Sequence, residues 1–332
     1  MNRSATIEDV ARVAGVSRQT VSNVLNSPAI VREATRERVE DAIRALGYAP
    51  HASARRLRTR RSSTIGVHLD PYAGGISGVV LDRFVHALTE RAGERGLRVV
   101  VYAARSPDEE IRRMRDLRDG GDIDAVVITG TFAGDPRTQW LRDQQVPFVS
   151  FGRPWGADDF GAPAHLWVDV DGAAGTAQAT RHALAAGPAV AFIGWPGGSG
   201  TGDDRERGWR EAMPVDAPHL RLTAPESVAA AREVAAAALA DHAIDAFVCA
   251  SDSLAVGAHL AAVALGRTGL VIAGFDNTPA AEALGLASVE QRPEDVATGV
   301  FDLLLGGDGV VAPRDVQAGS AHVVVAPTLV VR

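Results

Sequence analysis

The sequence contains no lysine, so all 34 of its basic residues are arginines. This absence excludes the phosphate-binding lysine of a P-loop and any mechanism that forms a Schiff base on lysine. The single cysteine, Cys249, has no partner for an internal disulfide, and its apolar neighbours predict a small buried side chain. No apolar run reaches the roughly 18 residues that span a bilayer, and the N-terminus lacks the apolar core of a secretory signal. We therefore expect a cytoplasmic protein that does not contact the membrane.

Catalytic signatures are missing as well. The nine histidines are scattered without metal-ligand spacing, and no Gly-x-Ser-x-Gly elbow occurs. We therefore expect no enzyme activity, no metal and no cofactor. The glycine-rich segment 197–202 is similar to a phosphate cradle, but the carboxylates of Asp203 and Asp204 directly after it favour a flexible loop at the edge of a cleft.

Charge is distributed unevenly along the 332 residues. Residues 1–64 carry 12 arginines against 6 acidic residues, whereas residues 65–332 carry 22 arginines against 35 acidic residues. A basic end on an acidic body indicates that only this end meets a polyanion. The densest basic run, 55–61, is by itself also compatible with a solvated linker. A chain of this length can form two or three domains with sizeable cores.

The first fifty residues predict three short helices. In the first helix, which Thr6 can cap, apolar side chains recur three and four residues apart, and Gly15 ends the helix. Ser17 can cap the second helix, and a third helix runs from near Thr35 to Gly47. Two helices joined by a short glycine-containing turn and followed by a packing helix form a helix-turn-helix unit. The expected buried side chains are Ile7, Val10, Ala11, Ala14, Val21, Val24, Leu25, Val39, Ala42, Ile43 and Leu46.

The second helix has an unusual polar face. Gln19, Asn23 and Asn26 lie opposite its expected buried side, and Arg18 and Ser22 flank them. A face that is only solvated favours residues of higher helix propensity, such as Glu, Arg and Ala. Gln, Asn and Arg are the side chains that read base edges in the major groove, and a recognition helix presents its N-terminal residues to the bases. The pattern therefore predicts sequence-specific contact with double-stranded DNA.

These residues closely resemble the headpiece of the LacI/GalR family of transcription regulators. The resemblance is carried by TIEDVARVAGVSRQTVSNVLN over 6–26, AIRALGYAP over 42–50 and ASARRL over 52–57. It implies base contacts from three residues of the second helix, phosphate contacts from their neighbours, and further DNA contacts from the headpiece and hinge. These are Arg18, Gln19 and Asn23 at the bases, Ser17, Thr20 and Ser22 near phosphates, and Thr6, Tyr48, Arg55, Leu57 and Arg58 elsewhere.

After Pro50, residues 51–58 of the expected hinge 51–61 can form a helix of about two turns. Such a short helix is unstable alone in water, so DNA and a second copy of the chain would have to stabilise it together. Leu57, apolar among arginines, suits a wedge inserted into a minor-groove base step, with Arg55 and Arg58 holding phosphates. The family resemblance assigns Leu57 this role.

Residues 64–332 predict two similar lobes, in which apolar strands alternate with helices as in a parallel sheet with right-handed crossovers. Residues 123–129 resemble 244–250, and 189–194 resemble the first strand at 64–69. Two such lobes offer a cleft between the carboxyl ends of their strands, where open sheets bind ligands. The expected fold is thus an all-α helix-turn-helix headpiece followed by a two-lobed α/β body with parallel sheets.

The body also resembles this family, which shares its fold with periplasmic sugar-binding proteins. The landmarks are WVDVDGAAG over 167–175, RERGW over 205–209, SDSLAVG over 251–257 and GFDNTP over 274–279. The match implies that Arg205 and Asp276 bind ligand hydroxyls and that Gln291 lies near the cleft. A planar guanidinium and a fixed carboxylate suit paired hydroxyls. A surface salt bridge from Arg205 to Asp203 or Asp204 is the alternative.

Four aromatic residues that follow strand-like runs are weaker candidates for the cleft, because each could equally belong to the core or anchor a loop. They are Tyr72, Phe132, Trp155 and Trp195. The sequence also departs from the family. Gly152 stands where some members have a sugar-binding carboxylate, Ser251 replaces a frequent asparagine, and the segment 266–274 is short. These departures leave the identity of the ligand open.

The resemblance implies a cytoplasmic repressor of carbohydrate-use genes that binds a palindromic operator as a homodimer and is released by a small sugar. A corepressor-activated repressor with a non-sugar ligand is the alternative. A sugar-transport protein is disfavoured, because it has no use for the first 61 residues. The chain ends at Arg332 without a leucine-heptad tail, which favours a dimer.

The expected organisation has three parts. They are a headpiece 1–50, a hinge helix 51–61, and an effector-binding and dimerisation domain 64–332, whose N-lobe comprises about 64–164 plus 293–318 and whose C-lobe comprises about 165–291 plus 319–332.

Overall fold

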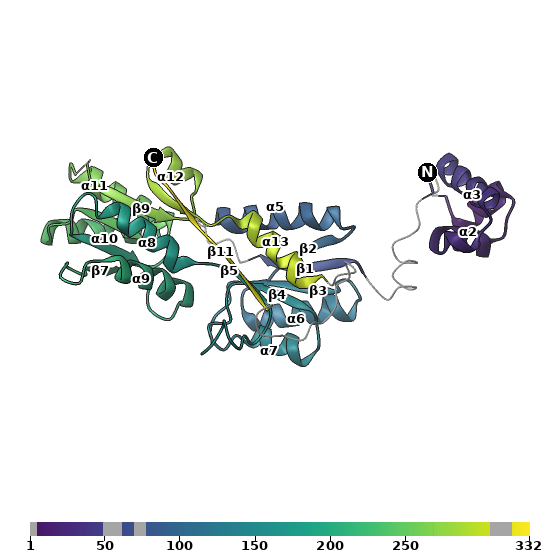
Figure 1. The fold of residues 1–332 in the computed structure, drawn as a ribbon, viewed down its shortest axis with the longest axis horizontal. Helices are drawn as coiled ribbons and strands as arrows, with labels where there is room; N and C mark the ends of the chain where they lie inside the picture. The colour runs from purple at the N-terminus through teal and green to yellow at the C-terminus, as the bar shows by residue number, and fades with distance from the viewer. Residues whose placement is uncertain (1–4, 49–61, 70–77, 268, 306–320) are drawn as a thin grey trace. The chain divides into compact units, whose positions relative to one another are not determined.

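The computed structural model describes residues 5–48, 62–69, 78–267, 269–305 and 321–332. It separates into two units, a headpiece up to Ser62 and a body from Ser63 onward (Figure 1). Each unit has its own apolar core. The predicted hinge helix, with Arg55, Leu57 and Arg58, lies outside the described residues, and so does Tyr72.

Within its described residues, the headpiece contains three helices and one 3-10 turn. They are α1 (Ile7–Ala14), α2 (Arg18–Asn26), η1 (Pro28–Ile30) and α3 (Glu33–Leu46). Gly15 and Gly47 adopt left-handed φ angles of 64° and 59° and end α1 and α3, as their positions predict. Helix α3 begins at Glu33, slightly before the expected Thr35. The core is formed by the predicted side chains: Val10, Ala11, Ala14, Val21, Val24, Val39 and Ala42 are buried, and Ile7, Leu25, Ile43 and Leu46 pack against them.

The first lobe of the body contains one parallel sheet. Its elements are β1 (Thr64–Leu69), α5 (Gly78–Glu94), β2 (Arg98–Ala103), α6 (Pro107–Asp119), β3 (Ala125–Thr129), α7 (Pro136–Asp143), β4 (Phe148–Phe151), β5 (Trp167–Val170), α13 (Pro293–Leu304) and β11 (His322–Val325). The strand order is β11-β5-β4-β3-β1-β2, with every pair parallel. Helices α5 and α13 pack together on one face, and α6 and α7 lie on the other (Figure 1).

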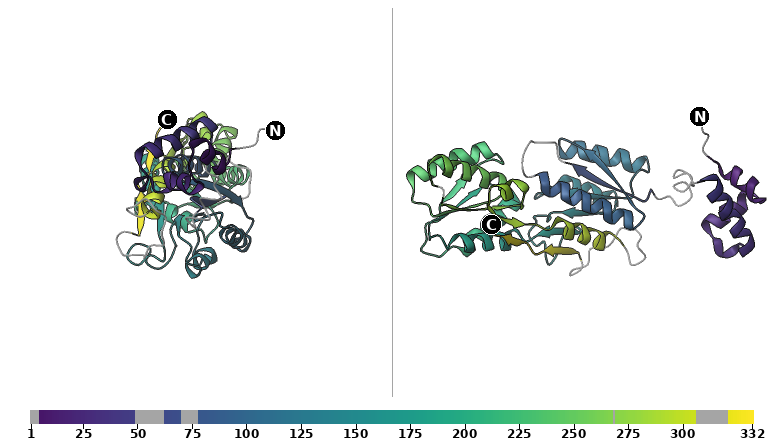
Figure 2. Two further views of the ribbon diagram at one scale, coloured as in Figure 1. Left: turned by 90° about the vertical axis from the view of Figure 1, so that its right-hand side faces the viewer. Right: turned by 90° about the horizontal axis from the view of Figure 1, so that it is seen from above.

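The second lobe repeats this arrangement. Its elements are α8 (Gly172–Ala183), β6 (Val190–Gly194), α9 (Gly200–Ala212), β7 (Arg221–Thr223), α10 (Val228–Asp241), β8 (Ala246–Cys249), α11 (Asp252–Ala264), β9 (Val271–Phe275), α12 (Pro279–Ala283), β10 (Ala287–Glu290) and β12 (Thr328–Val330). The strand order is β12-β10-β9-β8-β6-β7, and only β12 runs antiparallel. Helix α8 packs against α9, and α10 packs against α11. These helices cover the sheet of the second lobe (Figure 2).

The internal similarity seen in the sequence corresponds to equivalent strands. Strand β3 lies beside β1 in the first sheet, and β8 lies beside β6 in the second. The similar segments 123–129 and 244–250 therefore lead into the same place in each lobe. The two lobes share one strand order, and the last residues of strands from both sheets, among them Thr129 of β3 and Phe275 of β9, line a cavity between the lobes.

The expected boundary between the lobes is wrong in detail. Strand β5 pairs with β4, with Ser150 opposite Trp167, and β11 pairs with β5, with His322 opposite Trp167. Both strands therefore belong to the first sheet, although the sequence had assigned them to the second lobe. The chain crosses between the lobes after Val170, after Glu290 and between β11 and β12.

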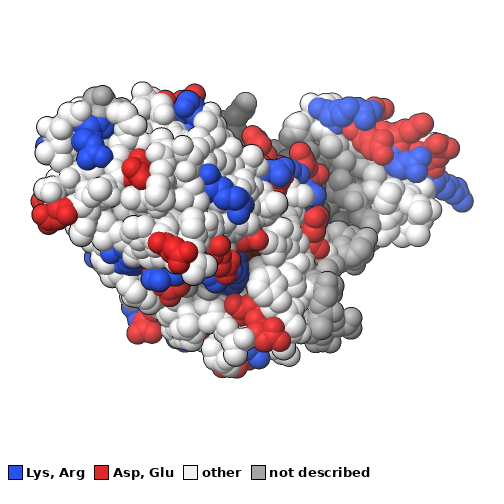
Figure 3. Space-filling view, turned by 60° about the vertical axis from the view of Figure 1, so that its left-hand side comes forward, with Lys and Arg blue, Asp and Glu red and all other residues white. Residues whose placement is uncertain are grey.

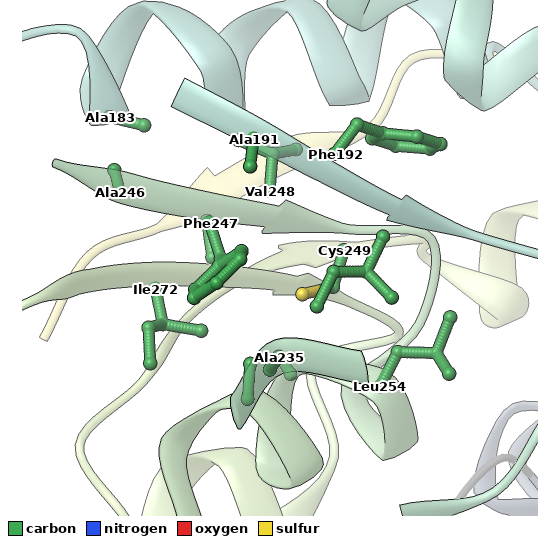
Figure 4. Packing of buried hydrophobic residues seen from close by; sticks show 14 of the residues in the cluster. Ala183, Ala191, Phe192, Ala235, Ala246, Phe247, Val248, Cys249, Leu254 and Ile272 are labelled. Atoms are coloured by element: carbon green, nitrogen blue, oxygen red, sulfur yellow. The ribbon is translucent and has the colours of Figure 1, made fainter. Parts of the chain in front are cut away.

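The core of the second lobe contains the single cysteine. Figure 4 shows Cys249 among apolar side chains that include Phe247, Leu254 and Ile272. Burial raises the pKa of the Cys249 thiol well above its ordinary value. The prediction of a small buried side chain is confirmed, and the group is unsuited to nucleophilic chemistry.

The described residues show neither a strongly charged surface patch in the view drawn nor a helix suited to a membrane. On the face drawn in Figure 3, acidic and basic side chains are interspersed, with no large patch of a single sign. Among the helices that the structure describes, none combines the length and the apolar character that a bilayer-spanning segment needs.

Candidate nucleic-acid interface and ligand cleft

Helix α2 begins with an exposed polar turn. The Ser17 hydroxyl accepts a hydrogen bond from the Thr20 backbone N–H at 3.1 Å and so caps the helix. Arg18 and Gln19, the next two residues, are exposed, whereas Val21 is fully buried. The headpiece core therefore fixes which side of α2 faces outward, and that side begins with the residues predicted to contact DNA.

Two interactions arrange the outward side chains of α2. The Gln19 amide donates to the Asn23 side-chain oxygen at 3.0 Å, one helical turn away. The Arg18 guanidinium lies 3.4 Å from the Glu8 carboxylate, and both side chains are more than half exposed. Exposed ion pairs contribute about 0–1 kcal/mol, so a phosphate or a base edge can displace Glu8 at little cost.

The remaining described DNA-binding candidates differ in character. Thr6 caps α1: its hydroxyl donates to Asp9 at 2.8 Å and accepts from the Asp9 backbone N–H at 3.3 Å. Tyr48 packs against the headpiece core, and partial burial together with Glu8 raises the pKa of its phenol. Ser22 is half-buried. DNA contact by these three residues stays a prediction.

Two joined cavities lie between the lobes. We call the cavity of about 210 Å³ the inner compartment and the cavity of about 480 Å³ the outer compartment, and both are lined by Val80, Arg205 and Gln291. The inner compartment is bounded further by Thr129, Phe151, Trp155, Asp169, Asp204 and Phe275. The outer compartment is bounded further by Trp195, Pro196, Ser199, Pro225, Glu226 and Asp276.

Arg205 and Asp276 meet where the compartments join. The Arg205 guanidinium lies 3.6 Å from the Asp276 carboxylate, donates to the Ala250 carbonyl at 2.5 Å and stands 3.7 Å from the centre of the Phe275 ring. The Gln291 amide donates to Asp276 at 2.6 Å. Arg205 is 6% exposed, so its alternative reading as a surface ion pair is wrong. The structure thus brings together the three residues that the resemblance assigns to the ligand.

Burial shifts the pKa values of the charged members of this trio. Burial raises the pKa of Asp276 to about 7, against the attraction of the Arg205 cation. Burial also lowers the pKa of Arg205, which its acidic neighbours oppose. The backbone of Asp276 has a φ of 107°, a strained value for a residue with a side chain. Such strain and such pKa shifts concentrate at functional sites.

Sequence reasoning missed a buried ion network beside the inner compartment. Arg153, which follows β4, donates to Asp169 at 2.9 Å and to Asp204 at 3.1 Å. Asp204 belongs to α9 of the second lobe, so this arginine connects the lobes. Burial raises the pKa of Asp169 to about 6, although Arg153 opposes the shift. No motif or residue spacing in the sequence predicts that Arg153 pairs with Asp169 and Asp204.

Glu226 was also missed, and it explains one departure from the family. Its carboxylate accepts hydrogen bonds from the Trp195 indole at 2.6 Å and from the Ser251 hydroxyl at 2.7 Å. Ser251 also caps α11 by accepting from the Leu254 backbone N–H. The serine thus contributes to the wall of the outer compartment through Glu226.

The aromatic candidates divide into two groups. Trp155 lines the inner compartment and Trp195 lines the outer one. Phe132 is 38% exposed and stands 5.8 Å from the Arg137 guanidinium, and it lines neither compartment. The structure therefore supports the two tryptophans as cleft residues and offers no support for Phe132.

Gly152 and the glycine-rich segment 197–202 lie at the cleft. Gly152 has a φ of 122°, and a Cβ there would lie 2.4 Å from the Thr131 hydroxyl, so this backbone has no room for a carboxylate side chain. The segment 197–202 leads into α9, where Ser199 accepts from the Gly202 backbone N–H. Its residues Ser199 and Thr201 line the compartments, which agrees with the predicted place at the edge of the cleft.

Comparisons with known proteins agree on both parts of the chain. Residues 6–51 match the family described as "Bacterial regulatory proteins, lacI family", and residues 80–302 match "Periplasmic binding proteins and sugar binding domain of LacI family". The HTH-type transcriptional regulator CelR of Thermobifida fusca is 34% identical over 304 residues, which cover 84% of each chain.

Solved structures extend this likeness. A CelR–cellobiose complex is 28% identical to this chain with a TM-score of 0.67, and the match covers 99% of both chains. A lac repressor dimer bound to operator and an anti-inducer is 23% identical with a TM-score of 0.80, and the match covers 99% of this chain and 98% of that one. At that identity the second likeness concerns the fold alone.

Proposed function

Because this chain belongs to the LacI family of bacterial transcriptional regulators, we propose that it represses carbohydrate-use genes by binding a palindromic operator as a homodimer. The family consists of DNA-binding regulators, not enzymes. In this proposal a small sugar in the interlobe cleft releases the operator. The observation that carries it is the presence, in one chain, of an outward polar turn on α2 and a buried Arg205–Asp276 pair that lines a cavity.

The chemistry of the cleft supports a sugar. Arg205 and Gln291 offer donors, Asp276 offers an acceptor, and vicinal hydroxyls both donate and accept. One relative has been solved as a complex with cellobiose. The tryptophans of the two compartments add the flat apolar surfaces on which the C–H face of a sugar ring can pack.

DNA contact is proposed for the α2 face and, on the sequence alone, for the hinge. Two headpieces of a dimer would read the two halves of a palindrome. Leu57 would enter a minor-groove step, with Arg55 and Arg58 at phosphates. This activity places the protein in the cytoplasm, with the chromosome.

Release follows from linkage between the two sites. A ligand shifts a conformational equilibrium only through different affinities for the two states, and a coupling of about 1–3 kcal/mol changes operator affinity about 5–150-fold. The cleft is formed by residues of both lobes, so a bound sugar favours one arrangement of the lobes. In a dimer, that arrangement sets the spacing of the two headpieces.

The test starts with the selection of DNA duplexes from a random pool by the purified full-length protein, followed by the addition of a panel of sugars. We expect a palindromic site and its release by at least one sugar. Arg205→Met should keep the site and lose the release, whereas Arg210→Met, an exposed position on the same helix, should behave as wild type.

The other outcomes are equally informative. A folded dimer that enriches no site would overturn the proposal. A site that a ligand tightens would replace induction by corepression.

A further inference from the structure

The dimensions of the cleft suit more than one ring. A cavity of about 150 Å³ holds a single benzene ring, so the inner compartment, at about 210 Å³, has room for one substituted six-membered ring. The outer compartment, at about 480 Å³, offers a second space. Because Val80, Arg205 and Gln291 line both, the two compartments are neighbours, and one ligand can occupy both.

Three residues that line the inner compartment each carry a buried polar atom without a hydrogen-bond partner among the described residues. Thr129 Oγ1, Trp155 Nε1 and Arg205 Nε are buried and have no hydrogen-bond partner among the described residues. All three residues line this compartment, although they come from β3, the loop after β4 and α9. Buried polar groups are rarely left unsatisfied, so three such groups in residues around one compartment favour a bound polar ligand there. All three can donate, and the hydroxyl and ring oxygens of a sugar can accept from them.

Trp155 closes the inner compartment by a contact between the lobes. It follows β4 of the first lobe and has a φ of 56°, and its ring packs on Gly200 at the start of α9 in the second lobe. A Cβ on Gly200 would lie 2.2 Å from the Trp155 ring. Glycine at position 200 therefore lets the indole reach across the cleft and cover one side of the inner compartment.

The outer compartment recognises its occupant differently. The Trp195 indole N–H is already bound to Glu226 at 2.6 Å, so the face of the ring is what remains for a ligand. Pro196 and Pro225 line the same space. The Trp195 ring stands 5.4 Å from the Arg205 guanidinium, which places its face next to the junction of the compartments. Stacking is therefore the main contact offered here.

We propose that the effector is a two-ring saccharide, with one ring enclosed beneath Trp155 in the inner compartment and the second ring stacked on Trp195 in the outer compartment. The inference rests on the proposed function of the cleft as a sugar site. The inner ring is selected by hydrogen bonds and therefore by the stereochemistry of its hydroxyls, whereas the outer ring is held mainly by stacking and tolerates more variation.

Calorimetric titration of the full-length protein tests this proposal. The probes are glucose, galactose and fructose, and the disaccharides cellobiose, maltose, melibiose and sucrose. At least one disaccharide should bind tenfold or more tightly than each of its component monosaccharides. The two variants are then tested with that disaccharide and with the monosaccharide that corresponds to its inner ring. Trp195→Ala should weaken binding of the disaccharide alone. Trp155→Phe removes the indole N–H and keeps a ring, and it should weaken binding of both ligands. Trp140→Phe, on α7 outside the cleft, serves as the matched control.

Two kinds of result would overturn the proposal. The first contradicts only the two-ring inference, and the second contradicts the proposed function as well. If a monosaccharide binds as tightly as every disaccharide, or if Trp195→Ala weakens both ligands equally, then a single ring sits at the junction and only the two-ring inference falls. If no saccharide binds or releases the operator, the proposed function falls as well. Gly200→Ala gives an independent check, because it displaces Trp155 without touching a polar group, and it should weaken both ligands.

Discussion

The carboxyl group of Asp276 is held in an unfavourable state, buried beside Arg205 with its backbone in the left-handed region. Burial raises its pKa to about 7, which means that keeping it ionised at neutral pH opposes folding. Stability alone would favour an uncharged side chain at this position. The proposed role of Asp276 in binding ligand hydroxyls gives a reason for this cost, which the rest of the second lobe offsets.

This cost predicts a measurable pH dependence. The unfolded chain releases the proton of Asp276 near pH 4, whereas the folded protein keeps it up to about pH 7, so stability falls as pH rises between these values. Asp169, with a pKa of about 6, adds to the same trend. Asp276→Asn removes one of these groups, and its unfolding free energy should therefore fall less between pH 5 and pH 7.5 than that of the wild type.

Urea unfolding at several pH values checks this slope, and the slope matters more than the absolute value because Arg205 loses its counter-ion in the variant. Asp82→Asn, at an exposed position on α5, is the control. Parallel curves for wild type and Asp276→Asn would contradict the prediction.

Single residues also show how far the sequence can be read. Arg205 and Asp276 could be predicted as ligand-binding residues from a family resemblance, because each lies in a recognisable motif, and the same resemblance predicted Gln291 near the cleft. Arg153 could not, because its partner Asp204 lies 51 positions away and meets it only when the lobes come together. Buried ion pairs between distant segments leave no periodicity, so no pattern in one sequence announces them.

At the scale of elements, the headpiece helices were the most predictable part. Their boundaries follow from local chemistry, with Ser17 and Gly15 acting at α2 and α1 as capping rules require. Strand β5 was assigned to the wrong lobe for the opposite reason. A buried strand reads as an apolar run whichever sheet it joins, and its sheet is decided by pairing with β4 and β11.

The polar turn of α2 carries a prediction at this scale. If Gln19 and Asn23 read base edges, each change to alanine should cost about 1–3 kcal/mol at the selected operator, which is roughly 5–150-fold in affinity. Binding to a random duplex should change little, because that binding rests on phosphate contacts. Both DNAs are measured at one salt concentration, and Thr35→Ala on α3 is the neutral control. Equal losses on the two DNAs would show that these amides do not read sequence.

At the scale of the whole body, side chains at two places tie the lobes together beside the crossing strands. Arg153 of the first lobe binds Asp204 of the second, and both are buried. Arg83 on α5 binds Glu290, at the end of β10, through two bonds of 2.9 and 3.1 Å. Although burial opposes it, hydrogen bonds from Asn277 and Arg83 lower the pKa of Glu290, so this carboxylate is charged at neutral pH. These pairs stabilise the arrangement of lobes in which the inner compartment is closed.

The Arg83–Glu290 pair offers a way to test the coupling without touching either ligand. It is partly exposed and contributes about 1 kcal/mol or less, so Arg83→Met should favour opening of the lobes up to about fivefold. A sugar that contacts both lobes binds the closed arrangement, so the variant should bind it more weakly. By reciprocity the operator complex should then need up to about five times more sugar for release.

Titration of the operator complex with sugar measures this shift, with Arg210→Met as a control that breaks an ion pair inside one lobe. Glu290→Gln should shift the release in the same direction. The double variant should shift it little further, because either single change already removes the pair. A release curve identical to that of the control would mean that the lobes do not move relative to each other during release, and the signal would then have to reach the headpieces through the first lobe alone.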